Sequence, residues 1–127
     1  MENKINIDEK TDLGGIDIYL KQDKWIKNTN KYSTVYIVFY GEIFQSTEII
    51  MLQRLLQSFC SNRMIENKRY KITDRVYAQI VKKHDYMLAL RNRNGEEITV
   101  MDKVYALYWS AIIQAILQKF PIFIHKP

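Results

Sequence analysis

A nine-residue run rich in β-favouring residues, Tyr32–Tyr40, constrains the fold of this chain more than any other feature of its sequence. Apolar and aromatic side chains occupy both alternating faces of the run, which is typical of a strand that is covered on both sides. Gly41 follows the run and predicts its end. We therefore expect a central strand, with Val35, Ile37 and Phe39 on one face and Tyr36, Val38 and Tyr40 on the other.

Other short strands are predicted near the two ends of the chain. Ile16–Leu20 alternates apolar and polar residues directly after Gly14 and Gly15, as a half-buried strand does, and its extension through Ile26 is left open. Ile122–Ile124 predicts a short final strand.

Residues 68–101 form a third extended region. Apolar residues alternate with polar ones in several short segments, although a helix over residues 74–83 stays open as the alternative. Asn94 and Gly95 predict a two-residue hairpin turn of type I′, in which both residues have positive φ. The residues expected to flank this turn as a cross-strand ion pair are Arg93 and Glu96.

The first of two helices is predicted over residues 47–61. Ser46 or Thr47 is suited to its N-cap, and the acidic Glu48 lies in its first turn. The periodicity places Ile49, Leu52, Leu56, Phe59 and Cys60 on an apolar face, with Gln53, Arg54 and Gln57 opposite. Cys60 is most simply a small core residue there.

The second helix is predicted from Lys103 to Lys119, with Asp102 as its N-cap. Its polar stripe is narrow, so the helix is expected to pack against more than one neighbour, and a second subunit is one of the candidates. Trp109 and Ile113 are expected to be buried. The residues that we assign to self-association are Tyr105, Tyr108, Trp109 and Ile113.

The order of these elements predicts an α+β fold, in which two principal helices pack on a mainly antiparallel sheet. With 127 residues the chain is long enough for one domain. We expect a single α+β domain over residues 14–127, preceded by a flexible, polar N-terminal arm over residues 1–13.

The charged residues are unevenly distributed. Residues 1–18 carry five acidic and two basic groups, whereas residues 54–93 carry ten basic and three acidic groups. The basic middle also interleaves cations with tyrosines, a composition suited to phosphates and nucleobases as well as to an ordinary exposed sheet. The residues that we assign to polyanion binding are Lys68, Arg69, Lys71, Lys82, Lys83, Arg91 and Arg93.

The sequence contains no recognisable catalytic pattern. His84 and His125 have no further ligands at metal-binding spacing, and Gly14-Gly15 opens neither a phosphate-binding loop nor a dinucleotide fingerprint. We therefore expect a non-enzymatic protein with no metal, no cofactor and no small-molecule substrate. The single cysteine, Cys60, excludes an internal disulfide.

One segment resembles a known family. The strand Tyr32–Tyr40, a polar turn, the helix over residues 47–61 and a basic strand that begins Arg69-Tyr70-Lys71-Ile72 follow the order found in rhabdovirus matrix proteins, in particular the small plant-infecting type. The resemblance covers about 40 residues and implies a small, basic assembly protein. It also implies self-association, and binding to a nucleocapsid or to an anionic membrane surface.

The sequence therefore predicts a matrix-like structural protein that self-associates and binds a nucleoprotein or another polyanion. The alternatives are a nucleic-acid-binding accessory protein, or a small inhibitor from a phage or mobile element that binds a host or defence protein. The first ten residues have no signal-peptide core, and the longest apolar stretch, Val104–Leu117, is too short to span a bilayer. An intracellular location is expected, in the host cytoplasm or the virion if the protein is viral.

Overall fold

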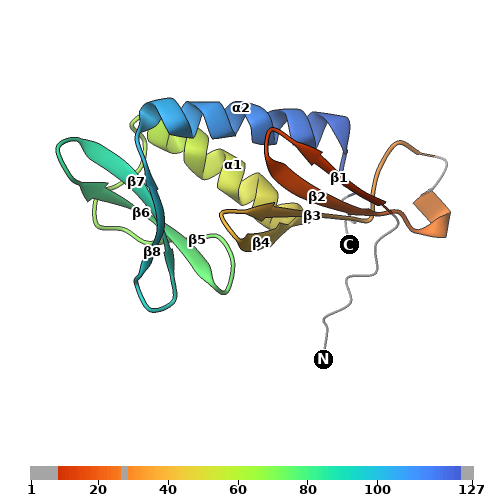
Figure 1. Cartoon of the computed structure of the whole chain (residues 1–127), viewed down its shortest axis with the longest axis horizontal. Coiled ribbons are helices and arrows are strands. Elements are labelled where there is room, and N and C mark those ends of the chain that lie inside the picture. The colour runs from red at the N-terminus through yellow and green to blue at the C-terminus, as the bar shows by residue number, and fades with distance from the viewer. Residues whose placement is uncertain (1–8, 27–28, 124–127) are drawn as a thin grey trace. The chain divides into compact units, whose positions relative to one another are not determined.

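Two four-stranded antiparallel sheets and two α-helices account for most of residues 9–26 and 29–123, which are the residues that the computed structural model describes (Figure 1). The α+β class is therefore confirmed, with two sheets in place of one. The chain divides into two compact units. The first runs to Ser46 and resumes at Ala115, and the second is Thr47–Gln114, so the expected single domain consists of two units.

The sheet of the first unit is a meander of four consecutive strands. Its strands are β1 (Glu9–Leu13), β2 (Ile16–Lys21), β3 (Thr34–Phe39) and β4 (Glu42–Gln45), and they lie in that order. The arm predicted over residues 1–13 lies outside the described residues up to Asp8. From Glu9 onward that prediction is wrong, because β1 pairs with β2 along its whole length.

Two tight turns connect this sheet. Gly14 and Gly15 join β1 to β2 with φ values of 60° and 88°, and Tyr40 and Gly41 join β3 to β4 with φ values of 52° and 77°. Positive φ at both residues is the geometry of a type I′ turn, whose twist matches that of the paired strands. Gly41 thus ends one strand and opens the next, and β4 was not foreseen.

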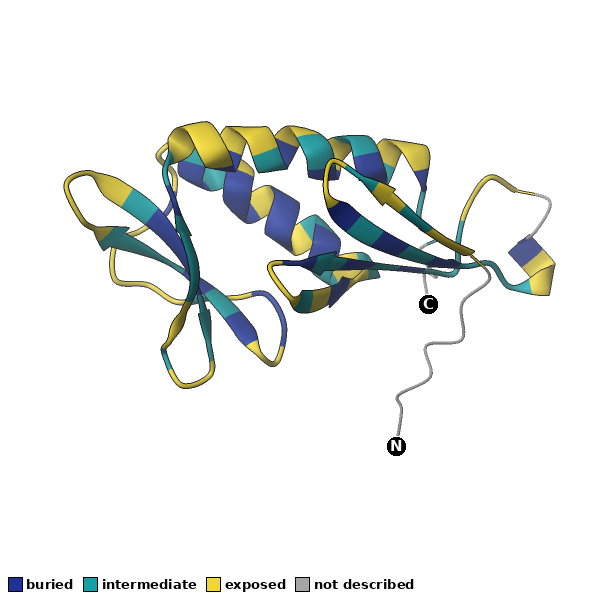
Figure 2. Cartoon of the chain, in the orientation of Figure 1, coloured by how far each residue is buried: buried dark blue, intermediate teal, exposed yellow. Residues whose placement is uncertain are grey.

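One face of this sheet forms the core of the first unit. Ile18 and Leu20 of β2 lie opposite Ile37 and Val35 of β3, and all four are fully buried. The other face of β3 is only half-buried at Tyr36 and Val38, and Tyr40 is exposed (Figure 2). β3 is therefore internal to the sheet as predicted, but a core covers only one of its faces.

Two further segments complete the first unit. The extension of β2 through Ile26 does not form, because β2 ends at Lys21 and residues Lys24–Ile26 make a short 3₁₀ helix. At the other end of the chain, Tyr32 forms a parallel bridge with Ile122. The predicted final strand is therefore one bridge among the described residues, and Ile124 lies outside them.

The second unit contains α1 (Ser46–Cys60) and the sheet β5 (Tyr70–Lys71), β6 (Val76–Lys82), β7 (Tyr86–Asn92) and β8 (Glu97–Met101). Within residues 74–83, Val76–Lys82 form β6 and the residues at either end lie in bends, so the helical alternative is excluded. Gln53 departs from its predicted exposed position. It is 5% exposed, and its amide nitrogen donates to Ser110 Oγ (3.1 Å) and to Gln114 Oε1 (3.2 Å).

The second helix, α2 (Lys103–Lys119), has the predicted bounds. The backbone N–H of Tyr105 donates to Asp102 Oδ1 at 2.9 Å, so the predicted N-cap is present. Ile113 is fully buried as expected, whereas Trp109 is only half-buried. No helix within the described residues is long and apolar enough to cross a membrane.

Candidate anion-binding site

The register of β6 and β7 brings two hairpin tips to one end of the second sheet. Val76, the first residue of β6, lies opposite Asn92, the last residue of β7. The turn that precedes β6 and the loop that follows β7 are therefore neighbours, although about twenty residues separate them in the sequence. Both tips are basic, since Arg75 lies in the first and Arg93 in the second.

The first tip is held by Thr73, a largely buried residue. Its hydroxyl oxygen accepts hydrogen bonds from the backbone N–H groups of Arg75 and Val76, both at 3.0 Å. A threonine hydroxyl that binds the backbone two and three residues later stabilises a tight turn. This local interaction fixes the backbone of Arg75, whose side chain is exposed.

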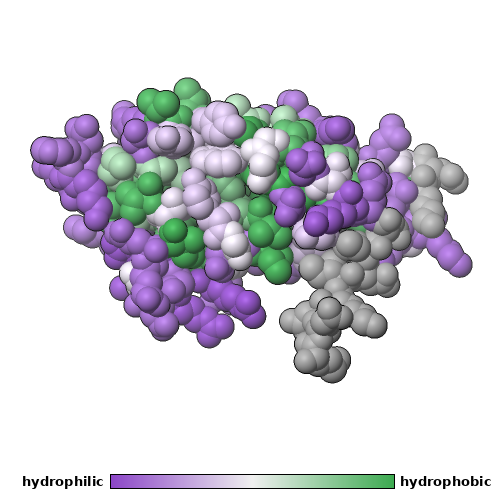
Figure 3. Space-filling model, viewed as in Figure 1, coloured by the Kyte–Doolittle hydropathy of each residue, from purple (hydrophilic) through white to green (hydrophobic). Residues whose placement is uncertain are grey.

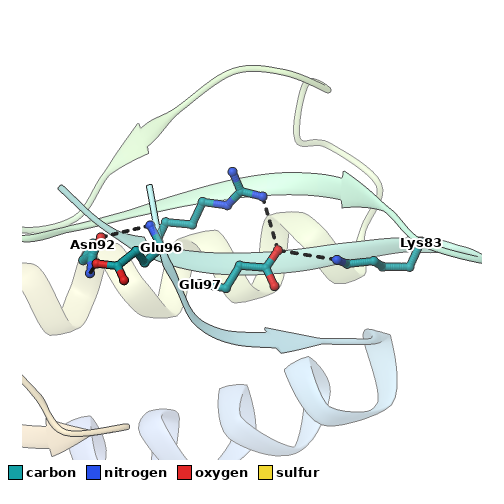
Figure 4. Close-up of polar contacts among 5 residues, drawn as sticks. Lys83, Asn92, Glu96 and Glu97 are labelled. Atoms are coloured by element: carbon teal, nitrogen blue, oxygen red, sulfur yellow. Dashed lines mark hydrogen bonds and ion pairs between the residues drawn. The ribbon is translucent and has the colours of Figure 1, made fainter. Parts of the chain in front are cut away.

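The second tip is a three-residue loop, Arg93–Gly95, and not the predicted two-residue turn. Only Gly95 has positive φ (81°), and its N–H donates to the carbonyl of Asn92 at 3.0 Å. Asn92 decides the turn type, because its Oδ1 accepts from the N–H groups of Asn94 and Glu96. Consequently Glu96 binds the Asn92 amide instead of pairing with Arg93 (Figure 4).

The two tips and the adjoining strands enclose a shallow pocket of about 230 Å³. The half-buried ring of Tyr77 supplies aromatic surface to the pocket, whereas the side chain of Val76 is buried on the other face of β6. The Arg69 guanidinium lies over that ring, with its carbon 5.0 Å from the ring centre. The described residues that line the pocket are Arg69, Lys71, Thr73, Asp74, Arg75, Val76, Tyr77 and Arg93.

The pocket is strongly cationic, with four basic side chains and one carboxylate. Lys71 Nζ lies 3.0 Å from Asp74 Oδ1, and this hydrogen bond is the main reason that the pKa of Asp74 is lowered. The charge of Arg93 lowers the pKa of Asp74 further. No ion pair within the described part of the chain involves Arg69, Arg75 or Arg93, so these three guanidinium groups are available to an external anion.

The seven residues predicted to bind a polyanion therefore do not all lie at one site. Arg69, Lys71 and Arg93 line the pocket, while Lys68 lies over the Tyr70 ring with its nitrogen 5.0 Å from the ring centre. The turn with Lys82 and Lys83 is at the opposite end of β6 from Arg75.

Three of the remaining candidates are engaged elsewhere. Glu97 accepts from Arg91 at 3.3 Å and from Lys83 at 3.5 Å, so the two cations share one carboxylate (Figure 4). Lys82 lies over the ring of Tyr86, at 5.5 Å from its centre. None of Lys82, Lys83 and Arg91 is among the described residues that line the pocket, so the candidate site does not include them.

Arg75 and Tyr77 belong to the site although they were not among the candidates. Tyr77 lies on the same face of the sheet as Lys71, with which it is paired in the register of β5 and β6. The sequence pattern alone does not give that register. Predicting Arg75 as a site residue required knowing where the turn before β6 lies.

The four residues predicted for self-association also differ in exposure. Tyr105 and Tyr108 are 60% and 53% exposed, and they share the outer side of α2 with the exposed Val104 and Leu107. Apolar side chains gather over the first turns of α2 in Figure 3. Ile113 is fully buried and is therefore not part of this exposed side of α2.

A second cavity lies beside α1 and α2 and contains the only cysteine. It measures about 590 Å³, and Arg54, Arg63 and Leu107 are part of its lining. Cys60 is half-buried there rather than in the core, and burial raises the pKa of its thiol, so the thiolate is disfavoured at neutral pH. Within the described ranges, no three His, Cys, Asp or Glu side chains are grouped as metal ligands.

The chain was compared with known protein families, curated proteins and solved structures. No protein-family model, no curated protein and no solved structure matches the chain.

Proposed function

We propose that the protein is a non-enzymatic nucleic-acid-binding protein that contacts the phosphate backbone through Arg69, Lys71, Arg75 and Arg93. One observation supports this proposal above the others: among the described residues, four cations and one carboxylate line a single pocket, and three of those cations form no ion pair there. Surface cations are commonly matched by nearby carboxylates, as Lys83 and Arg91 are by Glu97. An unmatched cluster favours an external anion.

The geometry favours contact with phosphates over reading of a base sequence. The cations come from two hairpin tips and a short edge strand, and sequence-independent affinity arises when such side chains displace counterions from phosphates. The proposal places the protein inside the cell, where nucleic acid is its partner.

Charge reversal tests the proposal. Arg75→Glu with Arg93→Glu should weaken binding to short labelled DNA and RNA strands by at least about 10-fold at low salt, measured by fluorescence anisotropy. Lys10→Glu with Lys24→Glu in the first unit is the matched control, because it makes the same change at two exposed lysines. Equal effects of the two double variants, or no binding by the unmodified protein, would overturn the proposal.

A second candidate function is supported by the outer side of α2. Val104, Leu107, Tyr108 and Ala111 are exposed and follow the i, i+3, i+4, i+7 spacing of a helix-packing stripe. Between Val104 and Ala111 the helix has no charged residue. A second copy of α2 would supply an equally uncharged stripe, so we propose self-association of the kind that a matrix-like assembly protein requires.

Tyr108→Glu tests this second candidate, because it places a charge in the centre of the stripe. The unmodified protein should form dimers or larger species at high concentration by mass-resolved size-exclusion chromatography, and the variant should stay monomeric. Lys119→Glu, an exposed change at the end of the same helix, is the control. A monomeric unmodified protein at all concentrations would exclude this function and leave the first candidate unaffected.

A further inference from the structure

The cationic pocket also contains an aromatic surface. Val76 is 2% exposed and faces the core, whereas the next residue, Tyr77, is half-buried on the opposite face of β6, so its ring supplies the aromatic surface of the pocket. Phosphate recognition alone requires no such surface. The pocket is also smaller than the 300–1,000 Å³ that is typical of sites for whole small molecules. The volume of the pocket and its aromatic surface suit one planar ring.

Arg69 and Tyr77 form a cation–π pair in the pocket. The guanidinium carbon of Arg69 lies 5.0 Å from the centre of the Tyr77 ring, within the range of a cation–π interaction. Arg69 is exposed, so its guanidinium is accessible to a ligand. Planar guanidinium groups and aromatic rings are the two surfaces on which proteins stack unpaired nucleobases.

We infer that this pocket recognises single-stranded nucleic acid, with one nucleobase stacked on the planar face of the Arg69 guanidinium beside Tyr77, and with the adjoining phosphates neutralised by the charges of Arg69, Lys71, Arg75 and Arg93. This inference rests on the proposed function, because the same cations hold the backbone. It adds a preference for single-stranded over double-stranded nucleic acid, which positive charge alone does not provide. In a duplex the bases are paired and stacked on each other, and a surface pocket cannot reach their faces without extruding one.

Arg69→Lys separates stacking from charge, because it keeps the positive charge and removes the planar group. Tyr77→Leu removes the ring and keeps every cation, and Tyr77→Phe is its conservative control. Three ligands are compared at the same low salt: a DNA single strand of about 12 nucleotides, the corresponding duplex, and inorganic polyphosphate, which has charge and no bases.

The unmodified protein should bind the single strand more tightly than the duplex. Arg69→Lys and Tyr77→Leu should each weaken single-strand binding by roughly 10-fold, the size of one lost stacking contact. Both variants should lose much less affinity for polyphosphate than for the single strand, and Tyr77→Phe, which keeps the ring, should bind the single strand more tightly than Tyr77→Leu.

The outcomes distinguish this inference from the proposed function. Equal affinity for strand and duplex, with Arg69→Lys indistinguishable from the unmodified protein on all three ligands, would overturn base stacking and leave backbone binding in place. Absence of binding to all three ligands would overturn both.

Discussion

The guanidinium of Arg69 lies over the ring of Tyr77, and Tyr77 lies opposite Arg91 in the neighbouring strand. The two arginines are therefore both close to one tyrosine, yet they differ in availability. Arg91 donates to Glu97, whereas no carboxylate pairs with Arg69 in the described chain. This difference distinguishes the candidate site from the rest of the basic surface.

Asp74 is the only carboxylate that lines the pocket, and Asp74→Asn should strengthen polyanion binding. The change releases Lys71 and removes a negative charge near Arg93. The expected gain is about 5-fold at low salt, the scale of one exposed charge interaction, and it should diminish as salt is added. Anisotropy titrations of both proteins measure it, and weaker binding by the variant would contradict the assignment.

Low pH should act in the same direction as Asp74→Asn. The pKa of Asp74 is lowered in the folded protein, so its carboxylate stays charged until the pH falls below the usual value of about 3.9. Any stability from its contact with Lys71 is present above that pH and is lost as the pH falls through the lowered pKa. Between pH 5 and pH 8 the affinity should therefore not change through Asp74.

Ile113→Ala should destabilise the protein by about 2–5 kcal/mol, the usual cost of truncating a buried aliphatic side chain. Ile113 is fully buried in α2, whereas Val104 in the same helix is 76% exposed. Val104→Ala is therefore the control and should change the free energy of unfolding by less than about 0.5 kcal/mol. Urea denaturation of both variants measures the difference, and similar midpoints would contradict the burial of Ile113.

Gly95→Ala should destabilise the β7–β8 hairpin by about 1 kcal/mol. Gly95 has φ of 81°, where an L-residue is strained, and a Cβ atom there would lie 3.7 Å from the Tyr77 hydroxyl, which is ordinary contact. The cost therefore comes from the backbone and not from a clash. Asn94→Ala is the control, since φ of Asn94 is not positive. Equal thermal stability of the two variants would refute the loop geometry.

Local signals in the sequence were sufficient for several elements. Asp102 was recognised as an N-cap because its side chain acts on its own helix, and Ile113 was placed in the core by helical periodicity. β1 was missed because Glu9–Leu13 is largely polar, and β4 because four residues after Gly41 give little periodicity.

Predicting the candidate site required the pairing register of the strands. Arg69 and Arg93 are twenty-four positions apart in the sequence, and only the register of β5, β6 and β7 brings them to one pocket. The same register places Lys82 at the other end of β6. In the β7–β8 loop, Asn92 overrides the Asn94-Gly95 signal through side-chain hydrogen bonds to the backbone. The turn preference of the Asn94-Gly95 pair does not take into account hydrogen bonds that a neighbouring side chain makes to the backbone.

The salt dependence of single-strand binding tests the central claim most directly, because its slope reports how many phosphates the cations neutralise. Contacts by Arg69, Lys71, Arg75 and Arg93 predict a slope of about −3 for log K against log salt concentration, so affinity should fall roughly 50-fold between about 50 and 200 mM salt. Arg75→Ala with Arg93→Ala should halve that slope. A slope that is unchanged in the double variant would contradict the account.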